Sequence, residues 1–148
     1  GIFPSMFPMH TFYWGDWYKK IVDPETAAGI SPMRSILDTG LHATSHTDAP
    51  VALPNLMQVV WATVNRTSRS GAVIGANERV TALEAMKMIT LWGAEQFGEQ
   101  ASKGSLEPGK LADMVVLSDN PITIDPMKIN TIKVLQTIKE GKTVYTRK

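Results

Sequence analysis

Apolar residues recur at helical spacing in the middle of the chain. Four of them lie on one face of a predicted helix over residues 54–68: Leu56, Val59, Val60 and Val64. A second helix is predicted from Thr81 to about Phe97, because Thr81 and Glu84 have the spacing of a capping box. The apolar face of this second helix consists of Ala82, Met86, Ile89, Gly93 and Phe97. We expect Gly93 to allow the close approach of a neighbouring element.

An α/β alternation precedes these helices. Residues 31–39 are predicted to form a short helix. Ser31 can cap it, Pro32 suits its first position and Gly40 can end it. A short strand over residues 41–45 follows and leads into the polar sequence His-Thr-Asp-Ala-Pro. Functional residues gather at the carboxyl ends of strands in α/β folds, so this polar sequence is a candidate site.

The first 18 residues hold seven of the eleven aromatic residues of the chain. Residues 2–7 have the composition of a short strand, which Pro4 and Pro8 restrict to a sheet edge or a strand end. We expect the remainder of this segment to form a long aromatic loop. Clustered aromatic side chains are more typical of a packed core or a lid than of a ligand cage.

β-Structure is predicted in the final third of the chain. The Pro-Gly pair at 108–109 suits the central positions of a type II turn. A short apolar strand is expected over residues 114–117. Residues 132–138 and 143–146 flank the Glu-Gly pair at 140–141 and are expected to form a hairpin.

These elements divide the chain into an α/β region, residues 1–100, and a β region, residues 101–148. A chain of 148 residues can form a hydrophobic core but is shorter than the roughly 250 residues of a complete (β/α)₈ barrel. The net charge of +1, without blocks of like charge, argues against a nucleic-acid partner. The absence of Cys excludes a disulfide scaffold, cysteine zinc ligands and a thiol nucleophile. No apolar run is long enough for a membrane span, and we expect a cytoplasmic protein.

The chain contains three histidines, His10, His42 and His46. On a regular strand His46 and Asp48 would point to the same side. An imidazole beside a carboxylate can bind a metal, relay a proton or position a substrate. A surface ion pair accounts for so short a pattern equally well. His42 would lie deeper on the same face, and we expect it to be a hydrogen-bonded core residue.

A catalytic metal site takes at least three protein ligands from converging elements. The candidates in this chain are His10, His46 and Asp48, so a complete metal site formed by this chain alone is not expected. The sequence also lacks the motifs of a nucleophile elbow, a P-loop and a dinucleotide-binding loop.

Three motifs occur in an order that resembles a known enzyme family. They are HTFYWGD at residues 10–16, HTDAPV at residues 46–51 and GSLEPGKLAD at residues 104–113. In this order they resemble the C-terminal part of the metal-dependent amidohydrolases. The first two motifs resemble the amidohydrolase-3 or imidazolonepropionase-like branch, which includes exoenzyme regulatory proteins. The resemblance covers essentially the whole chain.

This resemblance implies the C-terminal fragment of a (β/α)₈ TIM barrel with part of a small β-sandwich. Residues 1–8 would be the seventh barrel strand and residues 41–46 the eighth. Residues 54–68 and 81–98 would form the closing helices. Residues 104–148 would form the C-terminal share of the sandwich, a composite domain built from both ends of the family's chain.

The resemblance also implies roles for four residues. Asp48 would contact a divalent metal, expected to be zinc, and act as general base toward the attacking water. His10 and His46 would contact the substrate or stabilise the transition state, and Trp14 would line the substrate pocket. The other metal ligands of the family would lie upstream of Gly1, so the chain is expected to be the last quarter of a longer enzyme.

Two functions are compatible with these observations. The parent protein would hydrolyse non-peptide C–N bonds of a small molecule, such as an amide, imide or cyclic amidine, and the isolated chain would be inactive. Alternatively, the protein would be a non-catalytic regulatory or interaction protein on an amidohydrolase scaffold. Two barrel strands alone would leave apolar faces uncovered. We therefore expect self-association or a retained upstream fragment.

Overall fold

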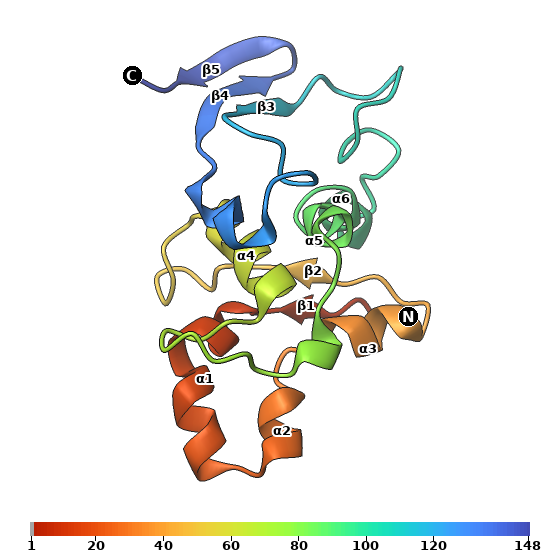
Figure 1. Ribbon diagram of the computed structural model, residues 1–148. Helices are drawn as coiled ribbons and strands as arrows, with labels where there is room; N and C mark the ends of the chain where they lie inside the picture. Colours follow the sequence, from red (N-terminus) through yellow and green to blue (C-terminus); the bar gives the residue numbers. More distant parts are fainter. Residues whose placement is uncertain (1) are drawn as a thin grey trace.

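The structure, a computed structural model, describes residues 2–148. In chain order the elements are β1 (Ser5–Met6), α1 (Met9–Ile21), α2 (Pro24–Ala28), α3 (Met33–Asp38), β2 (Thr44–Ser45), α4 (Leu56–Asn65), η1 (Ala76–Glu78), α5 (Ala82–Met88), α6 (Leu91–Gln96), β3 (Met114–Leu117), η2 (Pro126–Thr131), β4 (Val134–Lys139) and β5 (Lys142–Thr146). The two sheets lie at different levels of the molecule, with α4, α5 and α6 between them (Figure 1). The protein is therefore of mixed α/β class, as the sequence predicts. None of the helices within residues 2–148 is long and apolar enough to cross a bilayer.

Strands β1 and β2 form a parallel pair, although each is shorter than predicted. Ser5 lies opposite Thr44 and Met6 opposite Ser45. Helices α1, α2 and α3 lie between the two strands in the chain. Because parallel strands end at the same edge of a sheet, the residues after Met6 and those after Ser45 lie close together. This shared edge contains the candidate site.

The predicted aromatic loop after residue 7 is wrong, because most of it forms helix α1. Pro8 has helical backbone angles at the N-cap, and its carbonyl accepts a hydrogen bond from the Thr11 hydroxyl at 2.8 Å. Gly15 lets the helix pack closely on a loop, since a Cβ there would lie 2.6 Å from Cγ1 of Ile74. The close approach expected at Gly93 is absent, because nothing lies within 4 Å of a Cβ placed there.

Helix α3 begins later than its predicted cap. Pro32 occupies the N-cap position without a side-chain capping bond, so the predicted cap at Ser31 is wrong. Ser31 instead has a left-handed backbone, with φ 52°, and its hydroxyl donates to the Phe7 carbonyl at 3.0 Å. Gly40 follows the helix with φ 80°, and its N–H donates to the Leu37 carbonyl, as a helix stop requires.

Helix α4 matches its predicted position and provides much of the core. Asn55 caps it through a hydrogen bond from the Gln58 N–H to Asn55 Oδ1. Three of the four predicted apolar positions are buried, namely Val59, Val60 and Val64. Leu56, in contrast, is 45 % exposed. Trp61 is also buried, which shows that more than one face of this helix is covered.

The predicted helix over residues 81–97 starts correctly but is interrupted. The capping box forms, with hydrogen bonds from Thr81 N–H to the Glu84 carboxylate and from Glu84 N–H to the Thr81 hydroxyl. The chain leaves helical geometry at Thr90, whose hydroxyl bonds to a backbone carbonyl of the preceding turn, and this separates α5 from α6. The predicted apolar face is confirmed in part, because Ala82, Met86 and Ile89 are partly buried against the core. The buried positions are Ala85, Met88 and Trp92, and Phe97 is 80 % exposed.

Strands β3, β4 and β5 form an antiparallel sheet in that order. Glu140 and Gly141 join β4 to β5 with φ 49° and 77°, as a two-residue type I′ hairpin turn requires. Gly109 has φ 92°, which suits the predicted type II turn. Both turn predictions are thus confirmed.

Helix η2 connects the C-terminal region to the core of the N-terminal region. Ile129 and Ile132 are buried in the same hydrophobic cluster as Val60 and Trp61. The Trp61 indole N–H also donates to the carbonyl of Met127 at 3.1 Å. The division at residues 100 and 101 stays a prediction, but the two regions share one core at this contact.

Candidate functional site

Phe7 lies at the centre of the carboxyl edge shared by β1 and β2. It follows β1 directly, and its ring is buried. The Phe7 ring stacks on His46 with centroids 5.6 Å apart and meets His10 edge-on at 4.7 Å. Two of the predicted site residues are therefore held on one buried aromatic ring.

Helix α1 adds further aromatic rings on the side of His10. Trp14 lies one helical turn beyond His10, with ring centroids 5.7 Å apart, and Tyr18 lies one turn further. Trp14 also contacts Phe7, at 6.2 Å. The structure thus brings His10, Trp14 and His46 together.

Asp48 reaches the same area by a different path from the one predicted. Strand β2 ends at Ser45, so His46 and Asp48 do not alternate along a strand, and that part of the prediction is wrong. Asp48 lies in an exposed turn with a left-handed backbone, φ 51°, and the peptide bond between Ala49 and Pro50 is cis. The turn places the carboxylate where its charge influences His10.

The environment of His10 shifts its pKa. Burial lowers the pKa of His10 below its ordinary value, the negative charge of Asp48 raises it, and the nearby His46 lowers it. The lowering dominates, which favours the neutral form of the His10 imidazole. A neutral imidazole can accept a proton or a hydrogen bond from a substrate.

His46 is oriented by strand β1. The hydroxyl of Ser5 and Nδ1 of His46 share a hydrogen bond of 2.9 Å. This bond engages one ring nitrogen and leaves Nε2 as the nitrogen that can face a ligand. The side chain of His46 is therefore fixed by Ser5 at one edge and by the Phe7 ring across its face.

His42 lies away from this site, and its predicted place in the core is wrong. It is exposed just before β2, where Nδ1 lies 2.7 Å from the Glu95 carboxylate. Its ring stacks on Trp92 with centroids 4.5 Å apart. The expected hydrogen bond forms, but at the amino end of the strand.

The donor groups present here do not complete a metal site. Within residues 2–148, no group of three or more His, Cys, Asp or Glu side chains is close enough together to hold a metal ion. A carboxylate such as Asp48 suits one ligand position of zinc. The described residues therefore fit part of a metal site.

Comparison with known proteins identifies the family of this chain. A model of the amidohydrolase family matches residues 1–145. The chain belongs to the amidohydrolase family.

Known relatives of this chain extend well beyond the matched region. The chain is 33 % identical over 118 residues to the N-substituted formamide deformylase of Arthrobacter pascens, covering 80 % of this chain and 22 % of that protein. It is 32 % identical over 109 residues to a 5-methylthioadenosine/S-adenosylhomocysteine deaminase of Thermoanaerobacter pseudethanolicus, covering 70 % of this chain and 24 % of the deaminase. The chain thus spans about a quarter of the length of these relatives.

A solved structure shares the fold. An uncharacterised metal-dependent hydrolase from Pyrococcus horikoshii superposes with a TM-score of 0.68 at 22 % identity. The superposition covers 84 % of this amidohydrolase chain and 26 % of the other one. At 22 % sequence identity, this structural similarity shows a shared fold.

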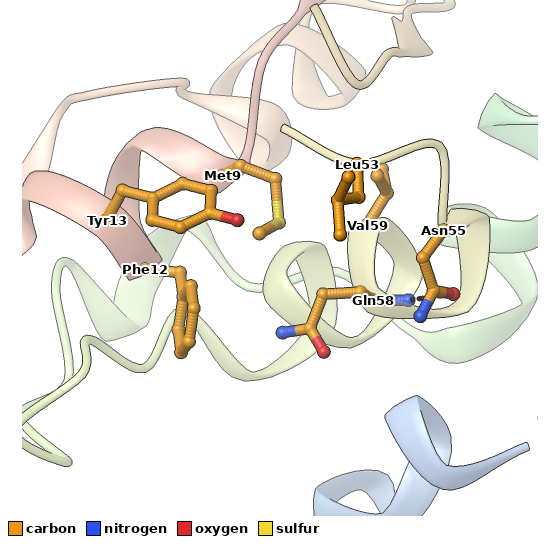
Figure 2. Close-up of a pocket in the computed structure, with 7 residues that line it drawn as sticks. All are labelled: Met9, Phe12, Tyr13, Leu53, Asn55, Gln58 and Val59. Atoms are coloured by element: carbon orange, nitrogen blue, oxygen red, sulfur yellow. Dashed lines mark hydrogen bonds between the residues drawn. The ribbon is translucent and has the colours of Figure 1, made fainter. Parts of the chain in front are cut away.

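A small cavity lies beside the site rather than within it. It has a volume of about 230 Å³ and is lined by Met9, Phe12, Tyr13, Leu53, Asn55, Gln58 and Val59. Figure 2 shows that these side chains come from α1, from α4 and from the segment that precedes α4. The predicted lining residue Trp14 is not among them, and it contacts Phe7 and His10 instead.

Sequence reasoning missed two supporting residues of the site, Phe7 and Ser5. The spacing of His10, Trp14 and Tyr18, four residues apart, is a helical signal that would have predicted α1. Once α1 is predicted, Phe7 lies in the short connection between β1 and α1. No local pattern indicates the bond between Ser5 and His46, because 41 residues separate them.

Proposed function

We propose that this amidohydrolase chain is the closing part of a (β/α)₈ barrel, with β1 and β2 as the last two strands. The parallel pairing of β1 and β2, joined through helices, supports this assignment. Residues 104–148 would then be the C-terminal share of a small β-sandwich. The remaining barrel strands would come from the rest of the complete protein.

The proposed reaction is hydrolysis of a non-peptide C–N bond in a small molecule, such as an amide, imide or cyclic amidine. The observation that carries this proposal is the gathering of His10, His46 and Asp48 at the carboxyl edge of β1 and β2. Support also comes from the names of two relatives, a deformylase and a deaminase, both of which describe the breaking of C–N bonds.

Asp48 would act as general base and as one ligand of a divalent metal, expected to be zinc. A bound divalent ion lowers the pKa of a water molecule toward neutrality. Asp48 would accept the proton of that water and return it to the leaving nitrogen. His10 and His46 would bind the substrate, and Trp14 would border it. The other ligands would lie outside residues 2–148, so the chain by itself would be inactive.

The test is turnover of a panel of small amides, imides and cyclic amidines by the complete polypeptide supplied with zinc. Asp48→Asn is expected to lower kcat/KM by about 10²–10⁴-fold, because it removes the base. Asn tolerates the left-handed backbone at position 48, where φ is 51°, so the substitution changes the charge and spares the turn.

Asp119→Asn is the matched control, since Asp119 is an exposed carboxylate outside the site. We expect its activity to stay within about twofold of wild type. Activity of Asp48→Asn at the wild-type level would overturn the proposed role of Asp48. Absence of turnover by the zinc-loaded wild-type protein would favour the non-catalytic regulatory alternative.

We also propose that the exposed apolar surface of this chain is covered by another part of the complete protein or by self-association. Phe97 is 80 % exposed, and Leu53 and Leu106 are similarly open. A cavity of about 860 Å³ also lies between α5, α6 and the C-terminal sheet. The test is light scattering during gel filtration: a dilute monomer that binds no apolar dye would contradict the proposal.

A further inference from the structure

Three hydrogen bonds in series connect a buried arginine to the start of helix α1. The Arg66 guanidinium donates from Nη1 to the carbonyl of Ser31 at 2.8 Å. The Ser31 hydroxyl donates to the carbonyl of Phe7 at 3.0 Å. The same Phe7 carbonyl accepts the backbone N–H of His10 at 3.2 Å. This path joins the end of α4 to the candidate site.

Arg66, the first residue of this path, is held in place by many hydrogen bonds. Its side chain is fully buried and donates to four backbone carbonyls, those of Ala28 (3.0 Å), Ile30 (2.6 Å), Ser31 (2.8 Å) and Ile74 (2.7 Å). Burial lowers the pKa of Arg66 to about 10, so the group stays charged at neutral pH. The planar fork of a guanidinium can serve several acceptors at once, whereas a lysine ammonium cannot match that geometry.

Ser31 connects Arg66 to Phe7 through its hydrogen bonds. Its backbone is left-handed, with φ 52°, a conformation that a non-glycine residue keeps only when its surroundings enforce it. The hydrogen bond from Arg66 to the Ser31 carbonyl supplies such a constraint. Held in this way, Ser31 directs its hydroxyl at the carbonyl of Phe7, where the chain passes from β1 into α1.

The Phe7 ring contacts both imidazoles of the site, since it stacks on His46 and meets His10 edge-on. We propose that Ser31 and Arg66 are positioning residues, which fix Phe7 and thereby set the orientation of the His10 and His46 rings. Neither of them needs to contact a substrate. The kinetic consequence of this positioning rests on the proposed function, whereas its structural consequence does not.

The experiment compares Ser31→Ala and Ser31→Gly with wild type in the complete polypeptide. The alanine variant removes the hydroxyl and keeps the Cβ at a positive φ. The glycine variant removes the hydroxyl and relieves the backbone conformation. The matched control is Ser35→Ala, because the Ser35 hydroxyl is also hydrogen-bonded, to Glu78, but has no connection to Phe7.

The first readout is the set of imidazole C–H resonances in ¹³C-histidine NMR spectra. In both Ser31 variants the signals of His10 and His46 are expected to move, because the ring current of Phe7 changes at both imidazoles. The signals of His42 are expected to stay, since His42 stacks on Trp92 instead. Ser35→Ala is expected to leave all three histidines at their wild-type positions.

The second readout is steady-state kinetics on an amide substrate. Both Ser31 variants are expected to lower kcat about tenfold with KM changed less than about twofold. Arg66→Lys keeps the positive charge but loses the planar guanidinium. It should lower kcat and shift the His10 and His46 signals, as the Ser31 variants do. If Arg66→Lys fails to fold, the two Ser31 variants decide the question alone.

Unchanged His10 and His46 signals in Ser31→Ala would overturn the positioning role. A wild-type spectrum of Ser31→Gly would also overturn it, because the hydroxyl would then be dispensable. If the wild-type protein hydrolyses none of the substrates, the proposed function fails. The NMR comparison still tests the positioning of the two imidazoles in that case.

Discussion

The two regions of this chain are held together in different ways. In residues 2–98, buried charged groups connect segments that are far apart in sequence. Arg66 bonds to four carbonyls, and the buried Glu78 carboxylate accepts the backbone N–H of Ser35 at 3.0 Å. In residues 102–148, every residue of β5 is exposed. This includes the apolar Val144, which is 62 % exposed.

This difference shows what each region depends on. The N-terminal region depends on long-range polar contacts inside a core, and losing one partner leaves others buried and unsatisfied. The C-terminal sheet depends on local turns and on an anchor in the N-terminal core, η2 packed against α4. In that anchor the Asn65 amide donates to the carbonyl of Pro126 at 2.9 Å. The loss of a buried charged group should therefore affect several segments of the first region, whereas the effect of a substitution in the second region should stay local.

The largest effect is expected for Arg66→Met. Removing the guanidinium takes a donor from four carbonyls, two of them buried (Ser31 and Ile74) and two partly buried (Ala28 and Ile30). Each buried carbonyl left unsatisfied costs about 1–3 kcal/mol, so the free energy of unfolding should fall by about 4 kcal/mol. Urea denaturation followed by tryptophan fluorescence measures this change. Arg69→Met is the control, because Arg69 is exposed over the Tyr13 ring and should cost about 0.5–1 kcal/mol. Equal losses in both variants would remove the contrast between buried and exposed arginines.

A smaller loss is expected for Ile129→Ala, which tests the anchor between the two regions. Ile129 is fully buried against α4, so truncation should cost about 2–4 kcal/mol. Limited proteolysis should then cleave first within residues 102–148. Ile122→Ala, at a residue 45 % exposed, is expected to change stability by no more than about 0.5 kcal/mol. Simultaneous cleavage of both regions would show that the sheet does not depend on this anchor.

Gly141→Ala should have a smaller and more local effect. Position 141 has φ 77° in the turn between β4 and β5, where a Cβ costs about 1 kcal/mol. Hydrogen exchange should become faster in β4 and β5 and stay unchanged in α4. Glu140→Asn in the same turn should be neutral or slightly stabilising, because Asn suits the left-handed conformation better than Glu. Faster exchange in α4 would contradict the local character of this region.

The smallest effect is expected from acid, through Glu84 in the first region. Burial pushes the pKa of Glu84 upward, but the hydrogen bonds from Thr81 and Arg34 outweigh it and leave the pKa below the ordinary 4.5. A carboxyl group whose pKa is lowered in the folded state stabilises the fold at pH values above its ordinary pKa. This stabilisation is lost as the pH falls through the folded pKa. Thermal unfolding between about pH 3 and 6 should show this loss in wild type and less of it in Glu84→Gln. Identical profiles would contradict the role of Glu84.

Sequence patterns predicted features that depend on a few neighbouring residues. The capping box of Thr81 and Glu84 and the turn at Glu140 and Gly141 are such features. The apolar face of α4 was also largely predictable, because helical periodicity reports burial directly. Helix α1 was missed, because its aromatic residues suggested a loop although their spacing is helical.

Features that depend on tertiary contacts could not be predicted. Nothing in the neighbourhood of Arg66 indicates that its side chain is buried, since its acceptors at Ala28, Ile30 and Ser31 are more than 30 residues away. The gathering of His10 and His46 likewise depends on the parallel pairing of β1 and β2. The motifs pointed to both histidines, but only the fold supplies Phe7 between them.

The contact between Gly15 and Ile74 limits which sequences this fold can accept. A Cβ at position 15 would come within 2.6 Å of Cγ1 and 3.1 Å of Cδ1 of Ile74. The two positions are therefore epistatic: alanine at position 15 becomes acceptable only when position 74 carries a smaller side chain, and the paired change is not the sum of the single ones. Homologues that have lost this glycine should carry a compensating reduction in size at the position of Ile74.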